Sequence, residues 1–212
     1  MSHYKPISQQ WSDKDVQKYR QWYFSWLNYI EKKCPVFKKK LRIFEIGSGV
    51  GSMASLLHER GHEVTGSDIS DLMVKSAALH CKPIRFVLCD IQKKIPSSTK
   101  FNVVMGFEVL EHVPNLTAAL KSIYQGLDIN GYFIGTTPYP YKKNFIDPTH
   151  VNVHFPSEWE GMFRKAGFRE VHVYPMSFFP LIWRIHKLFN PVLPFYTPLP
   201  LFISTTLIVA KK

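Results

Sequence analysis

Residues 41–51 constrain the fold more than any other part of the chain, and they read Leu-Arg-Ile-Phe-Glu-Ile-Gly-Ser-Gly-Val-Gly. The apolar run from Leu41 to Ile46 is typical of a buried parallel strand. Glycines follow at 47, 49 and 51, and a turn without side chains lets a ligand approach the backbone closely. Apolar residues at 53, 56 and 57 then predict an amphipathic helix. Strand, glycine turn and helix predict the first half of a nucleotide-binding βα unit.

The residues around this unit indicate which kind of nucleotide it binds. A dinucleotide fingerprint wants a third glycine at position 52, where this chain has Ser52. Glu45 precedes the first glycine, and its carboxylate would repel a pyrophosphate but attract an ammonium or sulfonium group. Three further strands, predicted over 63–67, 84–88 and 101–105, each end close to an acidic residue: Asp68, Asp90 and Glu108. Such carboxylates can accept ribose hydroxyls, so the predicted ligand is cationic and rich in hydroxyls.

These motifs, in this order, resemble those of class I S-adenosylmethionine-dependent methyltransferases. The matching segments are Glu45-Ile-Gly-Ser-Gly-Val-Gly51, Asp68-Ile-Ser, Cys-Asp90-Ile and Glu108-Val-Leu-Glu-His-Val113. Four motifs in the family's order are far more specific than one. The resemblance implies an α/β fold: a Rossmann-like, doubly wound sheet of seven strands, mostly parallel with the last strand antiparallel. An N-terminal helix and an apolar insertion before the last strand complete the expected fold.

The resemblance also implies S-adenosylmethionine as cofactor and a role for individual residues. Glu45 would hold the amino group of the methionine part, and Asp68 would hold the ribose. Met73, Asp90 and Ile91 would lie against the adenine. The full set of expected cofactor residues is Glu45, Gly47, Gly49, Gly51, Asp68, Ile69, Met73, Asp90, Ile91 and Phe107.

Composition narrows the class and the setting of the protein. The 212 residues include 27 Lys and Arg against 16 Asp and Glu, a net charge of +11, which raises nucleic acid or an anionic membrane as a partner. The chain has no RNA-binding motif, so nucleic acid is the less favoured of these partners. Three scattered cysteines suit a reducing compartment, without a disulfide framework or a structural zinc site. No signal peptide or apolar span is recognisable, so we expect a cytoplasmic protein and leave contact with a membrane surface open.

The chain is predicted to form a single methyltransferase domain over residues 1–212. Residues 1–40 would form a helical cap, with a helix from Ser12 to about Lys33, and 41–174 with 204–212 the cofactor-binding core. Further helices are predicted over 114–127 and 156–166, and further strands over 131–136, 169–174 and 204–210. The segments 137–155 and 175–203 leave the carboxyl ends of strands, where ligands bind in open α/β sheets. Both are therefore expected to roof the active site.

One group of residues could carry chemistry on a methyl acceptor. Glu108, Glu111 and His112 have helical spacing, so one turn would place them on one side, and His150 lies in the first roof segment. Carboxylates and imidazoles with open positions suit Mg²⁺, Mn²⁺ or Fe²⁺. The pattern, with Thr149-His150 downstream, resembles ubiquinone-biosynthesis O-methyltransferases, where it is associated with a divalent metal, and small-RNA 2′-O-methyltransferases. Two alternatives stay open: His150 or Glu111 acts as a metal-free base, or the Glu-His pair only shapes the cofactor pocket.

Residues 175–203 are dense in aromatic and aliphatic side chains and prolines, with Arg184 and Lys187 among the few charges. Such a segment needs cover, and three uses are open: a lipophilic acceptor pocket, docking at a membrane surface, or a homodimer interface. The function expected from the sequence is O-methylation of a small, partly lipophilic acceptor by a methyltransferase. An RNA-directed methyltransferase and a methyltransferase-like binding protein without turnover are the alternatives.

Overall fold

The computed structural model describes residues 13–96, 98–179, 191–199 and 201–212. In this part of the chain a seven-stranded sheet has the order β3-β2-β1-β4-β5-β7-β6. The neighbours from β3 to β5 are parallel, and β7 runs antiparallel to both β5 and β6. This is the Rossmann-like sheet with an antiparallel last strand, so the predicted fold class is confirmed.

Strands and helices follow the predicted order along the chain. The strands are β1 (Arg42–Ile46), β2 (Glu63–Asp68), β3 (Arg85–Leu88), β4 (Phe101–Phe107), β5 (Leu127–Pro138), β6 (Glu170–Phe178) and β7 (Ile203–Lys211). The α-helices are α1 (Asp13–Lys33), α2 (Ser52–Glu59), α3 (Asp71–His80), α4 (Leu116–Gly126) and α5 (Pro156–Lys165). Short 3-10 helices are η1 (Pro35–Lys38), η2 (Leu110–His112) and η3 (Lys142–Phe145). Ser12, at which the N-terminal helix is predicted to begin, lies outside the described residues.

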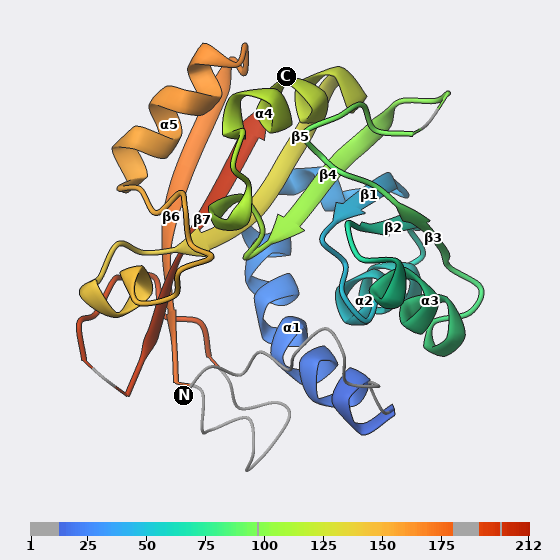
Figure 1. Ribbon diagram of the computed structural model, residues 1–212, viewed down its shortest axis with the longest axis horizontal. Helices are drawn as coiled ribbons and strands as arrows, with labels where there is room; N and C mark the ends of the chain where they lie inside the picture. Colours follow the sequence, from blue (N-terminus) through green and yellow to red (C-terminus); the bar gives the residue numbers. More distant parts are fainter. Residues whose placement is uncertain (1–12, 97, 180–190, 200) are drawn as a thin grey trace.

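Helices cover both faces of the sheet, and each face has its own apolar core (Figure 1). On one face, buried side chains of α1 and α2 pack with those of β1 and β4; on the other, side chains of α4 and α5 pack with those of β4 and β5. Strand β4 is buried along almost its whole length, as a strand covered on two sides must be. In the described residues, no helix combines the length and apolarity that crossing a bilayer requires.

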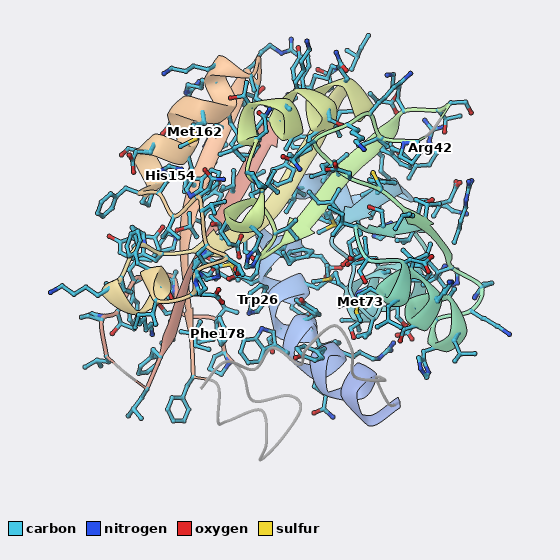
Figure 2. The ribbon with its side chains drawn as sticks, in the orientation of Figure 1. Trp26, Arg42, Met73, His154, Met162 and Phe178 are labelled. Carbon is cyan, nitrogen blue, oxygen red and sulfur yellow. The ribbon has the colours of Figure 1, made fainter. Side chains whose placement is uncertain are left out.

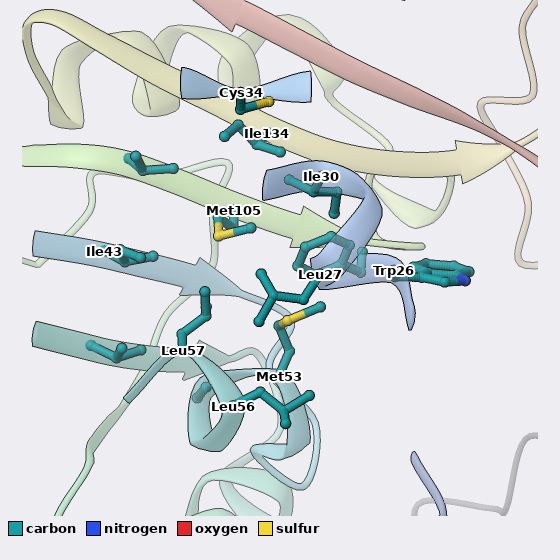
Figure 3. Packing of buried hydrophobic residues seen from close by; sticks show 14 of the residues in the cluster. Trp26, Leu27, Ile30, Cys34, Ile43, Met53, Leu56, Leu57, Met105 and Ile134 are labelled. Atoms are coloured by element: carbon teal, nitrogen blue, oxygen red, sulfur yellow. The ribbon is translucent and has the colours of Figure 1, made fainter. Parts of the chain in front are cut away.

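Helix α1 docks on the sheet through its aromatic and aliphatic stripe. Leu27 and Ile30 are fully buried and lie between α2 and the sheet (Figure 3). Trp26 meets Phe178 at the end of β6, with ring centroids 5.3 Å apart in an edge arrangement (Figure 2). This stripe of α1 therefore belongs to the apolar core, and Phe178, from the predicted roof segment 175–203, belongs to the same core.

Replacing Leu27 with alanine tests how much this docking stabilises the fold. The change removes a fully buried side chain and leaves a cavity, so we expect the free energy of unfolding to fall by about 3 kcal/mol. Urea unfolding followed by circular dichroism measures it. Lys32→Ala, at an exposed position of the same helix, is the matched control and should change stability by less than about 0.5 kcal/mol. Equal midpoints for the two variants would contradict the docking role of α1.

Candidate functional site

The glycine turn between β1 and α2 forms one wall of the site. Gly47, Gly49 and Gly51 all have positive φ, at 61°, 52° and 81°. A Cβ added at Gly47 would lie 2.4 Å from Val109 Cγ2, so this glycine lets the loop after β4 approach. A Cβ at Gly49 would meet nothing within 4 Å. The turn is therefore packed at Gly47 and open at Gly49, where a ligand can reach the backbone.

Glu45 is a buried carboxyl group beside this turn. It is 3% exposed near the end of β1, and its Oε2 has no hydrogen-bond partner among the described residues. Burial raises the pKa of Glu45 to about 8. A hydrogen bond from the Ala54 backbone opposes this rise, and the charge of Asp68 adds to it. An unpaired buried carboxyl group is unfavourable, so the position suits a cationic ligand that supplies the missing partner.

Asp68 links the end of β2 to the glycine turn. Its Oδ2 accepts a hydrogen bond from the Gly49 backbone at 3.0 Å, and its Oδ1 accepts one from Ser70 at 2.9 Å. Burial raises the pKa of Asp68, while these backbone donors oppose the rise. Each carboxylate oxygen has two acceptor positions, so Asp68 is anchored and can still accept hydroxyl hydrogens from a ligand.

A pocket of about 490 Å³ lies next to Asp68. Its lining is partly apolar and partly charged: Ile69, Leu88, Cys89, Asp90, Lys93, Lys94 and Pro96. Ile69 is mostly exposed and Asp90 accepts a hydrogen bond from the Gln92 backbone at 3.0 Å. The side chains of Met73, Ile91 and Phe107 are buried in the two apolar cores. Figure 2 labels Met73 beside α3.

The loop after β4 differs from the helical turn expected from the spacing of Glu108, Glu111 and His112. Glu108 has φ of 54°, and only Leu110–His112 form a short 3-10 helix, η2. A left-handed residue breaks a helical turn, so the prediction that all three side chains share one side of a helix is wrong. Glu108 turns toward β7, where its Oε1 lies 2.7 Å from Thr205 Oγ1.

Glu108 therefore binds Thr205 and is not among the three grouped ligand atoms, although it stays close enough for its charge to act on Glu111. Burial raises the pKa of Glu108, and the hydrogen bond from Thr205 opposes the rise. Thr205 Oγ1 also lies 2.7 Å from the Thr137 carbonyl oxygen, and a single hydroxyl proton serves one acceptor at a time. A protonated Glu108 would donate to Thr205, whose own proton would then go to Thr137. The four-residue metal set expected from the sequence is reduced to three.

Glu111, His112 and His150 do come together. One ligand atom from each lies within 4.8 Å of the other two, and His112 Nε2 is 3.8 Å from Glu111 Oε1. Glu111 is fully buried, and neither of its carboxylate oxygens has a hydrogen-bond partner in the described part of the chain. Burial and the nearby charge of Glu108 raise its pKa well above the ordinary value. Like Glu45, this carboxyl group lacks a partner that a cation or a proton donor could supply.

Hydrogen bonds orient both imidazoles of this group. His150 Nδ1 is 2.7 Å from the Asn144 carbonyl oxygen, which accepts only, so Nδ1 carries the proton. His112 Nδ1 faces the Thr149 carbonyl at 3.2 Å, which likewise makes it a donor. Burial and the neighbouring His150 lower the pKa of His112, which favours its neutral form. In the neutral form of each histidine, the nitrogen left without a proton is therefore Nε2, which can bind a metal or accept a proton.

Backbone hydrogen bonds hold the segment 137–155 over the loop after β4. Both Val151 and Asn152 donate their backbone N–H to the Glu111 carbonyl, at 2.8 and 3.0 Å. These contacts carry His150 to Glu111 although 39 positions separate the two residues in the chain. Sequence reasoning missed Asn144, Val151 and Asn152 in this role, because backbone pairing between distant loops leaves no periodic signal.

The second predicted roof segment, 175–203, is partly strand. Its first residues extend β6 to Phe178, and Ser177 exchanges backbone hydrogen bonds with Leu193 at 2.9 and 2.7 Å. Tyr196 stacks near Tyr139, which follows β5, with ring centroids 4.0 Å apart. Residues 180–190 of this segment lie outside the described residues, and the three uses expected for it are not distinguished by these contacts.

Comparisons with known proteins agree on a family. A model described as a methyltransferase domain matches residues 16–173. A ubiquinone biosynthesis O-methyltransferase of Paramagnetospirillum magneticum is 30% identical over 166 residues, which is 68% of this chain and 66% of the relative, slightly under two thirds of its length. A protein of the same name from Saccharophagus degradans is 29% identical over 177 residues, 73% of each chain.

Solved structures show the same fold at lower identity. A SAM-dependent methyltransferase from Archaeoglobus fulgidus is 23% identical, with a TM-score of 0.63 and 95% of each chain covered. Phosphoethanolamine N-methyltransferase 2 from Haemonchus contortus, in complex with S-adenosylmethionine, is 16% identical with a TM-score of 0.66. That alignment covers 97% of this chain and 58% of the nematode protein.

The raised pKa of Glu45 predicts how the stability of the ligand-free protein depends on pH. The unfolded carboxyl group ionises near pH 4.5 but the folded one near pH 8, so the folded state holds the proton between these values. The stability contributed by Glu45 is then present below pH 4.5 and is lost as the pH rises to 8, by a few kcal/mol. Glu45→Gln has no such proton and should be more stable than the unaltered protein at pH 8. Urea unfolding at pH 5, 6.5 and 8 measures this, and parallel curves for the two proteins would contradict it.

Proposed function

Because the chain belongs to the class I S-adenosylmethionine-dependent methyltransferases, we propose that it methylates a hydroxyl group of a small, partly apolar acceptor. The observation that carries this proposal is the group Glu111, His112 and His150 beside the glycine turn. A hydroxyl is a weak nucleophile until its proton is removed, whereas other acceptors need mainly positioning. A cluster of two imidazole side chains and a buried carboxyl group suits the first task.

The residues of the glycine turn fit the cofactor that the family uses. Glu45 offers an unpaired oxygen to the amino group, Gly49 leaves open space beside the backbone, and Asp68 has acceptor positions left for ribose hydroxyls. The pocket at Ile69 and Asp90 offers apolar and polar lining for the adenine. When bound, S-adenosylmethionine supplies a methyl group on a positively charged sulfur.

The proposed acceptor site follows from the contact between two loops. Val109 packs on Gly47, so η2, the turn that carries Glu111 and His112, directly adjoins the glycine turn. An acceptor oxygen held near His112 Nε2 and His150 Nε2 would lie on the same edge of the sheet as the methionine end of the cofactor. Its proton would pass to one of these nitrogens, or be displaced by a bound cation.

A divalent metal is the finer part of the proposal. Glu111, His112 and His150 would provide one carboxylate and two nitrogens, and the Nδ1 hydrogen bonds of both histidines would orient them. The unpaired buried Glu111 is the observation that fits a cation, because a cation would offset its desolvation. A bound divalent ion lowers the pKa of a hydroxyl that it coordinates. Glu108 is not part of this proposed site.

An apolar acceptor is supported by the side chains around this group and by the relatives. Tyr139, Phe155 and Tyr196 form an aromatic cluster just beyond β5, with Tyr139 ring centroids 6.1 Å from Phe155 and 4.0 Å from Tyr196. Relatives at about 30% identity are named for ubiquinone biosynthesis, which suggests a phenolic acceptor with an apolar tail. A methyl-donor assay in parallel on alkylated phenols, lipid extract and total RNA tests this choice. Turnover on RNA alone would favour the RNA-directed alternative, and cofactor binding without any turnover would favour a binding protein.

Asp68→Ala tests the cofactor site. Loss of charge-assisted hydrogen bonds should weaken binding of S-adenosylmethionine by about 1.5–3 kcal/mol in isothermal calorimetry. Asp71→Ala is the matched control, because Asp71 is exposed in the first turn of α3 and pairs with Lys75. Its affinity should equal that of the unaltered protein. Unchanged affinity in Asp68→Ala, or tight binding of a nicotinamide dinucleotide, would contradict the assignment.

Chelation and two histidine variants test the metal. A chelator should abolish turnover without affecting cofactor binding, and added Mg²⁺ or Mn²⁺ should restore it. His150→Ala should lower kcat by about 10²-fold or more, a typical loss for a base or a metal ligand. His154→Ala, in the same segment but packed on Trp159, is the control and should keep most of the activity. If the chelator has no effect while His150→Ala still lacks turnover, His150 is a general base and the metal proposal is wrong.

A further inference from the structure

Exposed apolar side chains gather on two segments of the chain. Among the described residues, seven of the twelve exposed large hydrophobic side chains belong to 139–155 or 191–203: Phe145, Ile146, Val151, Phe155, Phe195, Leu199 and Leu201. Ile146 is 78% exposed. Loops are normally polar, and soluble proteins seldom concentrate apolar side chains on exposed loops without a partner. We call these seven residues the apolar rim.

The two segments form one continuous surface. Lys143 Nζ donates to the Phe202 carbonyl oxygen at 2.9 Å, and the Tyr139 backbone N–H donates to the Ser204 carbonyl at 3.2 Å. Figure 1 shows the segment with η3 beside the segment that precedes β7, at the same end of the molecule. The exposed side chains of the apolar rim therefore lie on two neighbouring segments.

The backbone under the apolar rim is tied to the sheet. Ser177 pairs with Leu193 through two backbone hydrogen bonds, and its Oγ donates to the Phe195 carbonyl at 2.6 Å. On the other segment, Val151 is held by the Glu111 carbonyl at 2.8 Å. Because both loops are pinned, the backbone that carries these exposed side chains is fixed at the surface. The apolar surface is thus built into the fold.

The charge around the apolar rim is positive. Lys142 and Lys143 adjoin Phe145 and Ile146, and residues 175–203 contain no acidic residue. Asp147 is the one acidic residue of 139–155, and the whole chain carries a net charge of +11. Apolar side chains bordered by lysines match a bilayer surface with anionic headgroups, because the side chains enter the acyl boundary while the lysines meet the headgroups.

This chemistry fits a lipid surface better than a second copy of the chain. In a twofold dimer the same patch faces itself, so the lysines of both copies would be brought together. Nucleic acid is also a poorer fit, because the rim includes aliphatic residues such as Ile146, Val151, Leu199 and Leu201, which offer bases neither hydrogen bonds nor stacking.

We propose that the apolar rim docks the protein on an anionic lipid bilayer and admits a lipophilic acceptor from it to the site. The second part rests on the proposed function. His150 lies in the same segment as Ile146 and Val151, so a surface that touches the bilayer adjoins the proposed acceptor site. An acceptor with a long apolar tail could then bring its hydroxyl to His150 while the tail stays in the lipid.

Vesicle sedimentation with matched variants tests the docking. The full chain is mixed with vesicles of phosphatidylglycerol and phosphatidylcholine in a one-to-two ratio, and with phosphatidylcholine alone. We expect binding to the anionic vesicles that weakens with added salt, and a loss of about tenfold or more in affinity for Ile146→Ser with Leu201→Ser. Ile129→Ser is the control: Ile129 is 84% exposed near the start of β5, away from the rim, and its variant should bind as the unaltered protein does.

The outcomes separate the docking from the proposed function. Absence of vesicle binding by the unaltered protein, or equal binding by the double variant, would overturn the docking. A dimer that the double variant dissociates without vesicles, or retention of RNA instead of lipid, would overturn it as well. If the double variant fails to fold, Phe195→Ser with Leu199→Ser replaces it. Neither pair of substitutions should affect the methylation of a short-chain, water-soluble phenol in the absence of vesicles. If the protein methylates this phenol but does not bind lipid, only the docking is contradicted. If it binds lipid but methylates no acceptor, only the proposed function is contradicted.

Discussion

The rest of the site depends on the close contact between Gly47 and Val109. A side chain at position 47 would overlap Val109, so the glycine lets the loop after β4 lie against the cofactor turn after β1. The strands below are matched in the same way, because a Cβ at Gly106 of β4 would lie 2.6 Å from Ile46 Cγ1 of β1. The residues proposed to bind the cofactor and those proposed to act on the acceptor are thereby fixed relative to one another before either ligand arrives. Positioning of this kind supplies much of the catalysis in a displacement reaction.

Two buried carboxyl groups with unpaired oxygens give the ligand-free site its electrostatic character. Glu45 on the cofactor side and Glu111 on the acceptor side both have pKa values raised by burial. Their ionised forms are unfavourable in the folded protein, so these two groups lower the free energy of unfolding of the ligand-free protein. A cationic ligand at Glu45 would restore part of this stability, and so would a cation or proton donor at Glu111. Ligand binding and the stability of the fold would then change together.

The sequence predicts local features of the fold better than long-range ones. The strand and glycine turn at 41–51 are predictable because β-branched residues and glycines act over a few positions. The spacing of Glu108, Glu111 and His112 predicts that their side chains share one side of a helical turn, and this prediction is wrong. Residue 108 has a left-handed backbone conformation, which breaks the helical turn. The approach of His150 to Glu111 depends on backbone hydrogen bonds from Val151 and Asn152, which any residue but proline can make. Burial of Met73 and Ile91 likewise depends on packing between distant elements.

The place of β7 between β5 and β6 has a consequence for how the chain folds during synthesis. Both neighbours are made before β7, yet they bond to it and not to each other. Until residues 203–211 leave the ribosome, β5 and β6 each present an unpaired edge. The part of the sheet from β3 to β5, with its helices, can form while translation continues, but β6 can join the sheet only through the final strand. If a ribosome stalled shortly before position 203, the unpaired edges of β5 and β6 would stay exposed. Exposed strand edges of this kind are natural substrates for chaperones.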